Sequence, residues 1–441
     1  MRGENEIRAI LEGALARSKA DQTEVLFLGK DSHLTRFANS YIHQNVSESN
    51  AEIRVRAALG KRIGVASTNN LSPEGLARVV EAAETVARFQ PEQPDFESLP
   101  GPMPIQAAKG FSEATAAYTP EARAEGVGLI CRRAQEAKLS ASGAFTTEVS
   151  ELAVANSLGT WAYHPATEAS LVTVIMSENS SGYGEAQAWD VSTFDIDELG
   201  DNAVKRAIIS KNPTTIEPGR YTVILEEYAV ADIVHYLSYM GFGALSLQEG
   251  QSFMTGKLGQ AIGDPRITIV DDGSNPAGLP RPFDYEGVPK QRVELIQAGI
   301  ARAVVYDSYT ARKEGKASTG HARPSPNPMG PYAMNLFMSP GSDGKRSMIR
   351  AIDQGLWVTR FHYVNPLDRR KAILTGMTRD GTFKIENGEI TDPVKNLRFT
   401  QSMLETLNQV QMVGRTTRLV GGARVPALLV REFNFTGVTE F

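Results

Sequence analysis

Cysteine is almost missing from this chain, and its scarcity excludes several classes of protein. Of the 441 residues, only Cys131 is a cysteine. A single cysteine cannot form a disulfide within the chain, and zinc or iron–sulfur sites built on several cysteines are excluded as well. We therefore expect a protein of a reducing compartment, and the cytoplasm is the expected location.

Long apolar runs are missing too. The first twenty residues alternate charged and apolar side chains and lack the continuous apolar core of a signal peptide. The longest uncharged stretch, from Pro324 to Ser342, contains five prolines, which favour a loop over a membrane helix. The sequence therefore predicts no contact with a membrane.

A strong charge of either sign is also lacking. The chain has 46 Lys and Arg against 51 Asp and Glu, for a net charge of −5, and both signs are spread along its length. The densest basic run, Arg369 to Lys371, follows Asp368 and is typical of a solvated loop. Direct binding to nucleic acid is therefore not expected.

Several catalytic motifs are absent. The sequence has no GxxxxGK phosphate loop, no complete GxGxxG fingerprint and no GxSxG nucleophile turn, and its six histidines form no HExxH pair. His321 follows Ser318, Thr319 and Gly320, so it is either a base beside a hydroxyl or a solvated loop histidine. The pattern alone leaves both interpretations open.

Acidic residues gather in two short segments. These are ITIVDDG, with Asp271 and Asp272, and FDYEG, with Asp284 and Glu286. Such carboxylates can hold a hard cation through oxygen ligands or can cap turns at the ends of strands. A hydrolase built on Asp271, Asp272 or Glu286 is a further alternative.

The fold class predicted from periodicity is α+β. Residues 1–215 are expected to form an N-terminal antiparallel sheet with covering helices, and residues 216–441 a mixed, β-rich α+β domain. Apolar spacing predicts a helix over 6–20, and the Ser72–Pro73 and Thr119–Pro120 pairs predict two capped helix starts. Alternation or β-branched residues predict strands at 23–28, 51–59, 62–67, 152–156, 160–163 and 170–176.

Three further elements are predicted in the middle and second half of the chain. Residues 199–209 are expected to be helical. Turn pairs at Ala298–Gly299 and Asn387–Gly388 indicate two β-hairpins.

Longer motifs in the second half are specific. They are QEGQSFMTGKLGQ at 248–260, ITIVDDG at 267–273, FDYEGVPKQRVELIQAGI at 283–300 and DSYTARKEGKASTG at 307–320. In these segments the chain resembles the TldD/PmbA family, long called modulators of DNA gyrase. The resemblance implies a metallopeptidase-like protein, because TldD members are similar to zinc peptidases that act on unfolded or extended peptides.

The sequence departs from that family at the metal motif. Active members carry HExxxH on the helix before the QSF segment and a cysteine near the C-terminus. The corresponding positions here are His235, Tyr236 and Met240, and no cysteine follows Cys131. A phenol and a thioether are poor replacements for a carboxylate and an imidazole at zinc. This pattern is similar to the TldE (PmbA) branch, which lacks the zinc motif.

The resemblance implies a role without catalysis by the chain itself. We expect a subunit of a TldD-type cytoplasmic metallopeptidase complex, with no cofactor of its own and with zinc only in a TldD-like partner. Dimers of the family enclose a chamber for an extended peptide. Residues expected to line it are Asp271, Asp272, Arg312, Ser318, Thr319 and Gly320. The alternative is a homodimeric peptide-binding or scaffolding protein without a protease partner.

Overall fold

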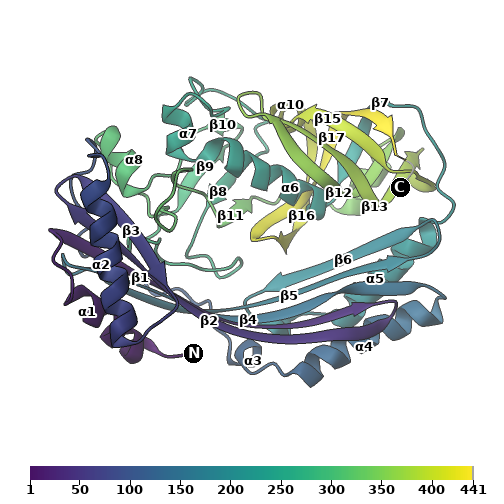
Figure 1. The fold of residues 1–441 in the computed structure, drawn as a ribbon. Helices are drawn as coiled ribbons and strands as arrows, with labels where there is room; N and C mark the ends of the chain where they lie inside the picture. Colours follow the sequence, from purple (N-terminus) through teal and green to yellow (C-terminus); the bar gives the residue numbers. More distant parts are fainter. Residues whose placement is uncertain (440–441) are drawn as a thin grey trace.

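The first half of the chain forms a curved six-stranded antiparallel sheet, which lies beneath a β-rich body in Figure 1. The structure is a computed structural model, and it describes residues 1–439. The strand order of the sheet is β3-β2-β1-β4-β5-β6. The strands are β1 (Gln22–Ala38), β2 (Tyr41–Leu59), β3 (Arg62–Thr68), β4 (Ser140–Asn156), β5 (Trp161–Met176) and β6 (Ser181–Ala188).

Helices cover the convex face of this sheet, α1 and α2 at one end and α4 and α5 at the other (Figure 1). Buried residues of β1 on this face, such as Phe27 and Phe37, are odd-numbered, as alternation requires. The even-numbered Leu26 faces the opposite way and shares a cluster with Phe283 of the upper body. The helices are α1 (Glu4–Leu15), α2 (Pro73–Phe89), α3 (Glu113–Ala116), α4 (Pro120–Glu136) and α5 (Ile196–Ile209).

The upper body is built on a closed ring of strands. β7 (Gly219–Leu225) pairs with β12 (Gln354–Asp368), β12 with β13 (Ile373–Glu386), β13 with β15 (Leu397–Ser402), β15 with β17 (Ala423–Val438), and β17 with β7 again. A closed ring leaves none of its strands as a free edge. The sheet continues through β8 (Ile269–Asp271), β9 (Val293–Gln297), β10 (Ile300–Ala301), β11 (Leu336–Met338), β14 (Glu389–Val394) and β16 (Val410–Val420).

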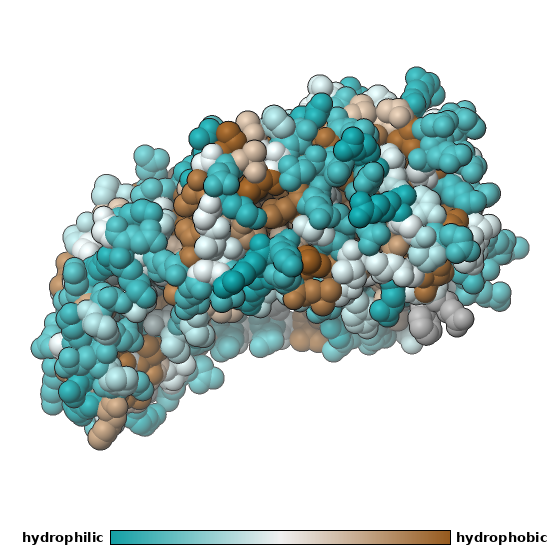
Figure 2. Space-filling view, turned by 90° about the horizontal axis from the view of Figure 1, so that it is seen from above, coloured by the Kyte–Doolittle hydropathy of each residue, from teal (hydrophilic) through white to brown (hydrophobic). Residues whose placement is uncertain are grey.

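Short helices join and cover these strands. α6 (Glu227–Leu237) packs against β12 and β17 and continues into a π-helical turn, Ser238–Phe242. The others are α7 (Ala244–Gln248), α8 (Ser308–Lys313), α9 (Lys345–Arg350) and α10 (Met403–Asn408). Seen from above, the surface is mainly hydrophilic, with hydrophobic residues in separated patches (Figure 2). Within residues 1–439, no helix combines the length and apolar character needed to cross a membrane.

The turn and capping signals of the sequence are confirmed. Ser72 and Thr119 accept hydrogen bonds from backbone N–H groups of the helices that follow them. Asn387 and Gly388 have φ of 51° and 77° between β13 and β14, and the Ala298–Gly299 turn joins β9 and β10. The α+β class is also confirmed, and the domain division at residue 215 stays a prediction.

Several predicted boundaries are wrong. β4 begins at Ser140 instead of residue 152, and the predicted strands at 160–163 and 170–176 are one continuous strand, β5. The first helix ends at Leu15 instead of residue 20. β1 and β2 extend far beyond the predicted strands, over residues 29–38 and 41–50. Residues 41–50 of β2 are exposed on both faces, so no apolar alternation marks them as a strand.

Candidate functional site

The helix that carries the metal-motif positions is a packing element. Val230, Ile233, Val234 and Leu237 have no exposed surface and belong to the main core of the upper body. They follow one another at helical spacing, so one face of α6 is fixed against β12 and β17. The other positions of α6 are therefore left for contacts with other parts of the molecule.

His235 lies against the turn between β16 and β17. A Cβ atom added to Gly421 would be 2.8 Å from Cε1 of His235, so the ring would have to shift to admit a larger residue there. Burial lowers the pKa of His235, and a hydrogen bond with the backbone of Gly421 opposes this shift. The imidazole is therefore neutral and is held against backbone atoms.

Tyr236 and Met240 point to different surroundings. The Tyr236 hydroxyl donates to the backbone carbonyl of Val364. Met240 has no exposed surface and lies in the core. The three motif positions therefore do not converge on a common point.

Oxygen atoms that could act as metal ligands near α6 lie beside an arginine. A cavity of about 220 Å³ beside the helix is lined by Asp232, Glu185 and Arg360, among others. Burial raises the pKa of Asp232 to about 7, and the Arg360 guanidinium opposes this shift. A permanently charged guanidinium in the same cavity also repels a cation.

These side chains do not fit a zinc ion. Catalytic zinc takes three protein ligands, commonly imidazole, carboxylate or thiolate, and the motif offers one imidazole engaged with a turn. In the part of the chain that the structure describes, no group of three His, Cys, Asp or Glu side chains is arranged to hold a metal.

Two of the predicted residues meet in a buried cluster. Asp271, at the end of β8, accepts a hydrogen bond from Nε2 of His321 at 2.9 Å and another from the backbone N–H of Asn335 at 2.8 Å. Nζ of Lys290 lies 3.6 Å from the same carboxylate. His321 is 1% exposed, so its interpretation as a solvated loop histidine is wrong.

The charges of this cluster follow from burial and proximity. Burial works against the Asp271 carboxylate, but Lys290, His321 and the backbone of Asn335 together hold its pKa well below its usual range. Burial and the Lys290 ammonium lower the pKa of His321, so the ring is neutral, with a proton on Nε2. The cluster is therefore an ion pair between Asp271 and Lys290 with a neutral imidazole beside it.

The loop before His321 is fixed by the same network. Oγ1 of Thr319 lies 2.9 Å from Nδ1 of His321 and accepts from the backbone N–H of Tyr306 at 2.7 Å. Gly320 has φ of 74°, and a Cβ there would be 2.3 Å from the carbonyl oxygen of Pro289. A hydroxyl, an imidazole and a carboxylate are thus in line, but His321 and Asp271 have no exposed side-chain surface. A substrate cannot reach the imidazole, and the arrangement supports the loop.

The other acidic residues of these two segments accept hydrogen bonds in turns or form ion pairs. Oδ1 of Asp272 accepts from the N–H and hydroxyl of Ser274. Asp284 accepts three backbone N–H groups, from Glu286, Val288 and Ala322. Burial and the neighbouring Glu286 carboxylate nevertheless raise the pKa of Asp284 to about 8.

Arg56 joins the two halves of the chain. Its Nη2 donates to Glu24 of β1 at 2.6 Å, and its Nη1 donates to Glu286 of the upper body at 2.9 Å. Burial and the Glu286 carboxylate raise the pKa of Glu24 to about 7, while Arg56 opposes this shift. The sequence analysis missed this contact, since an outward-facing arginine on a half-buried strand signals only a polar face.

A cavity of about 800 Å³ opens beside this contact, between the first sheet and the loops around α8. We call it the interdomain cavity. Arg312 is one of its lining residues. Arg312 and Ser318 also line a neighbouring cavity of about 370 Å³, together with Leu99 and Val288. The predicted site residues thus divide between a buried cluster, a turn and the walls of cavities.

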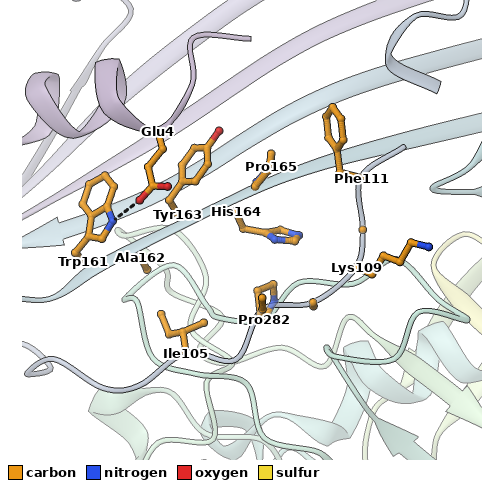
Figure 3. Close-up of a pocket in the computed structure, with 13 residues that line it drawn as sticks. Glu4, Ile105, Lys109, Phe111, Trp161, Ala162, Tyr163, His164, Pro165 and Pro282 are labelled. Carbon is orange, nitrogen blue, oxygen red and sulfur yellow. Dashed lines mark hydrogen bonds between the residues drawn. The ribbon is translucent and has the colours of Figure 1, made fainter. Parts of the chain in front are cut away.

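Another cavity, of about 410 Å³, lies along β5 (Figure 3). It is lined by Trp161, Tyr163 and His164 of β5, by Glu4, which accepts from Trp161, and by residues around Phe111. Nε2 of His164 lies 3.2 Å from the carbonyl of Pro280, and burial lowers the pKa of His164 to about 4. The ring is neutral and ties β5 to the upper body.

Three family models match the chain. They are described as the PmbA/TldA metallopeptidase domain 1, central domain and C-terminal domain, and they match residues 23–87, 108–211 and 218–437. Together they extend over most of the chain and over both halves of the fold.

Curated relatives agree with these models. The chain is 26% identical to the metalloprotease PmbA of Escherichia coli O157:H7, over 98% of this chain and 97% of that protein. It is 26% identical to a metalloprotease TldD homolog of Haemophilus influenzae, over 83% and 80%. A match to a metalloprotease of Methanothermobacter thermautotrophicus, at 27% identity, spans about half of either protein.

Solved structures share the fold. TldE from Thermococcus kodakarensis superposes with a TM-score of 0.89 at 20% identity, covering 98% of this chain and all of that one. A Thermotoga maritima protein described as a modulator of a DNA gyrase gives a TM-score of 0.88, also at 20% identity and with the same coverage. The models and relatives together show that the chain belongs to the PmbA/TldD metallopeptidase family.

Proposed function

We propose that this chain is a TldE-like, metal-free subunit of a TldD-type cytoplasmic metallopeptidase complex. In this complex a TldD-like partner binds the zinc, and the present chain supplies part of the chamber that receives an unfolded peptide. The proposal goes beyond family membership, which by itself does not say which subunit type the chain represents.

The observation that carries the proposal is the divergence of the three motif positions. His235 is held against Gly421, Tyr236 donates to Val364, and Met240 is buried in the core. A metal site here would need ligands in place of Tyr236 and Met240, and it would need His235 released from its contact with Gly421. A loaded zinc ion in this subunit alone is therefore not expected.

The experiment compares the isolated chain with the chain co-purified with a TldD-like protein of the same genome. Zinc is measured by mass spectrometry, and cleavage is followed on an unstructured peptide. We expect no stoichiometric zinc and no cleavage from the isolated chain, and both from the complex. His235→Ala is the matched variant, and it should leave zinc content and cleavage by the complex unchanged.

Stoichiometric zinc together with proteolysis from the isolated chain would refute the proposal. A source genome without a TldD-like protein carrying HExxxH and a C-terminal cysteine would favour the homodimeric peptide-binding alternative. Size-exclusion chromatography with light scattering then measures self-association directly.

A further inference from the structure

We propose that the interdomain cavity binds the carboxyl terminus of a peptide, with the terminal carboxylate held by Arg312 and Arg323 and the last side chain on the apolar wall. The inference rests on the proposed function in taking a peptide as the ligand. It adds a recognised chemical group and the residues that recognise it.

The cavity has an apolar patch on one of its walls. The first half of the chain contributes this patch, formed by Ile63 and Val65 of β3, Val86 of α2 and Phe96, together with polar residues such as Gln90 and Gln93. The second half contributes mostly polar residues from the loop Asp307–Arg312 and the segment Ala322–Asn327. Its volume of about 800 Å³ is within the range of cavities that enclose small ligands. Such a site suits a ligand with one apolar and one charged end.

The acidic groups on its walls already have partners. Asp95 lies 3.7 Å from Nζ of Lys313. Asp307 accepts from the backbone N–H and the hydroxyl of Thr310 at 2.7 and 2.6 Å. Glu286 is paired with Arg56 at 2.9 Å. Asp95 and Glu286 thus have cationic partners, Asp307 is held by hydrogen bonds at the start of α8, and none of the three forms an ion pair with Arg312 or Arg323.

Two arginines on its walls have no such partner. Within residues 1–439, neither Arg312 nor Arg323 forms an ion pair with a carboxylate, although both are half-buried. The Arg323 guanidinium lies 5.5 Å from the ring centroid of Tyr332 and donates to Sδ of Met329. The buried Nε of Arg56, on the same cavity, also lacks an acceptor. These unmatched donors predict an anionic ligand, and a guanidinium matches a carboxylate with two parallel hydrogen bonds.

A carboxylate fits better than a phosphate. Phosphate sites usually use the free N–H groups at the start of a helix. At the start of α8, the Asp307 side chain already accepts from the Thr310 N–H and the Glu286 side chain from the Ser308 N–H. The adjacent apolar wall in turn favours an anion that carries a side chain, as a peptide terminus does. An apolar last residue would lie against Phe96 and Val86 while its carboxylate meets the arginines.

The test uses the full chain and fluorescence anisotropy. The probe is an N-terminally fluorescein-labelled peptide of Gly, Ser and Ala ending in leucine, compared with the same peptide ending in a carboxamide. We expect the free acid to bind about tenfold more tightly than the amide, because the amide lacks the charge-assisted hydrogen bonds. N-acetylleucine should displace the labelled free-acid peptide at a lower concentration than inorganic phosphate does.

Variants assign the effect to the cavity. Arg312→Met combined with Arg323→Met should abolish the discrimination between acid and amide, and Arg312→Lys should keep part of it. Arg346→Met, an exposed arginine on α9, is the matched control and should change nothing. Thermal melts followed by circular dichroism verify folding, and the single variants replace the double one if it does not fold.

Equal affinity for acid and amide, or no measurable binding of either, overturns this inference. So does tighter competition by phosphate than by N-acetylleucine. None of these outcomes affects the proposed function, which depends on zinc content and cleavage in the complex. Conversely, zinc and proteolysis from the isolated chain would refute the proposed function and leave this binding site untouched.

Discussion

Asp271 and His321, fifty residues apart in the sequence, share a hydrogen bond of 2.9 Å between two side chains that have no exposed surface. The carboxylate also accepts from the backbone N–H of Asn335. One buried acid thus holds together β8, the loop that ends at His321 and the segment before β11.

Asp271→Asn should lower the free energy of unfolding by about 3 kcal/mol. An asparagine offers one acceptor oxygen, so its amide NH₂ would face the donor of either His321 or Asn335, and the Lys290 ammonium would lose its counter-charge. Urea denaturation followed by circular dichroism measures the change. Asp272→Asn is the control, since an amide oxygen can still accept from Ser274, and a change of similar size there would contradict the prediction.

Glu24→Gln should flatten the dependence of stability on pH. Because the pKa of Glu24 is raised to about 7, the folded protein keeps a proton that the unfolded chain, with the ordinary glutamate pKa of about 4.5, releases. The free energy of unfolding therefore falls as pH rises through this interval, by about 3 kcal/mol. Glutamine does not titrate, so the variant lacks this part of the decrease in the free energy of unfolding.

Urea unfolding of wild type and Glu24→Gln at a series of pH values between 4.5 and 8 measures the effect. Glu52→Gln, a partly exposed glutamate of β2 paired with Arg54, serves as the control. Parallel curves for wild type and Glu24→Gln would show that the carboxyl is ionised throughout.

His164→Leu should remove sensitivity to acid. The pKa of His164 is lowered to about 4. Below pH 6.5, the ordinary histidine pKa, the unfolded chain therefore binds a proton that the folded protein does not bind. Stability is therefore lost as pH falls from 6.5 to 4, by about 3 kcal/mol for this group. Thermal melts across this range measure it. His43→Leu, an exposed residue of β2, should retain the wild-type slope.

Phe433→Ala should destabilise the upper body by about 3–5 kcal/mol. The Phe433 ring has no exposed surface and lies 5.6 Å from the ring of Phe361 and 5.3 Å from that of Phe399, measured between centroids. Removing it leaves a cavity that neighbouring rings cannot fill without shifting β12 or β15. Phe89→Ala is the control: that ring is 85% exposed, and we expect a change within about 0.5 kcal/mol.

Signals that depend on a few neighbouring residues could be predicted from the sequence. Ser72 and Pro73 mark a helix start because one accepts a backbone N–H and the other cannot donate one. Asn387 and Gly388 mark a hairpin because both adopt a positive φ. The packing stripe of α6 is also local, since it follows from 3.6-residue periodicity.

Contacts between distant segments could not be predicted in this way. Alternation places Arg56 on the face of the sheet away from the side that buries Val55. Nothing in β2 indicates that the upper body covers the Arg56 face and brings Glu286 to it. His321 looks like a solvated residue because its loop is polar, yet Asp271 and Lys290 bury it. That Arg312 and Arg323 both line one cavity is likewise a product of the tertiary fold.

The closed ring of the upper body also sets an order of events during synthesis. Its strand β7 begins at Gly219 and its neighbour β17 begins at Ala423, about 200 residues later. All strands of the first sheet lie within residues 22–188, so the ribosome releases them while β17 is still unmade. The curved sheet can thus assemble during translation. β7, in contrast, keeps the edge that pairs with β17 unpaired until β17 has been synthesised.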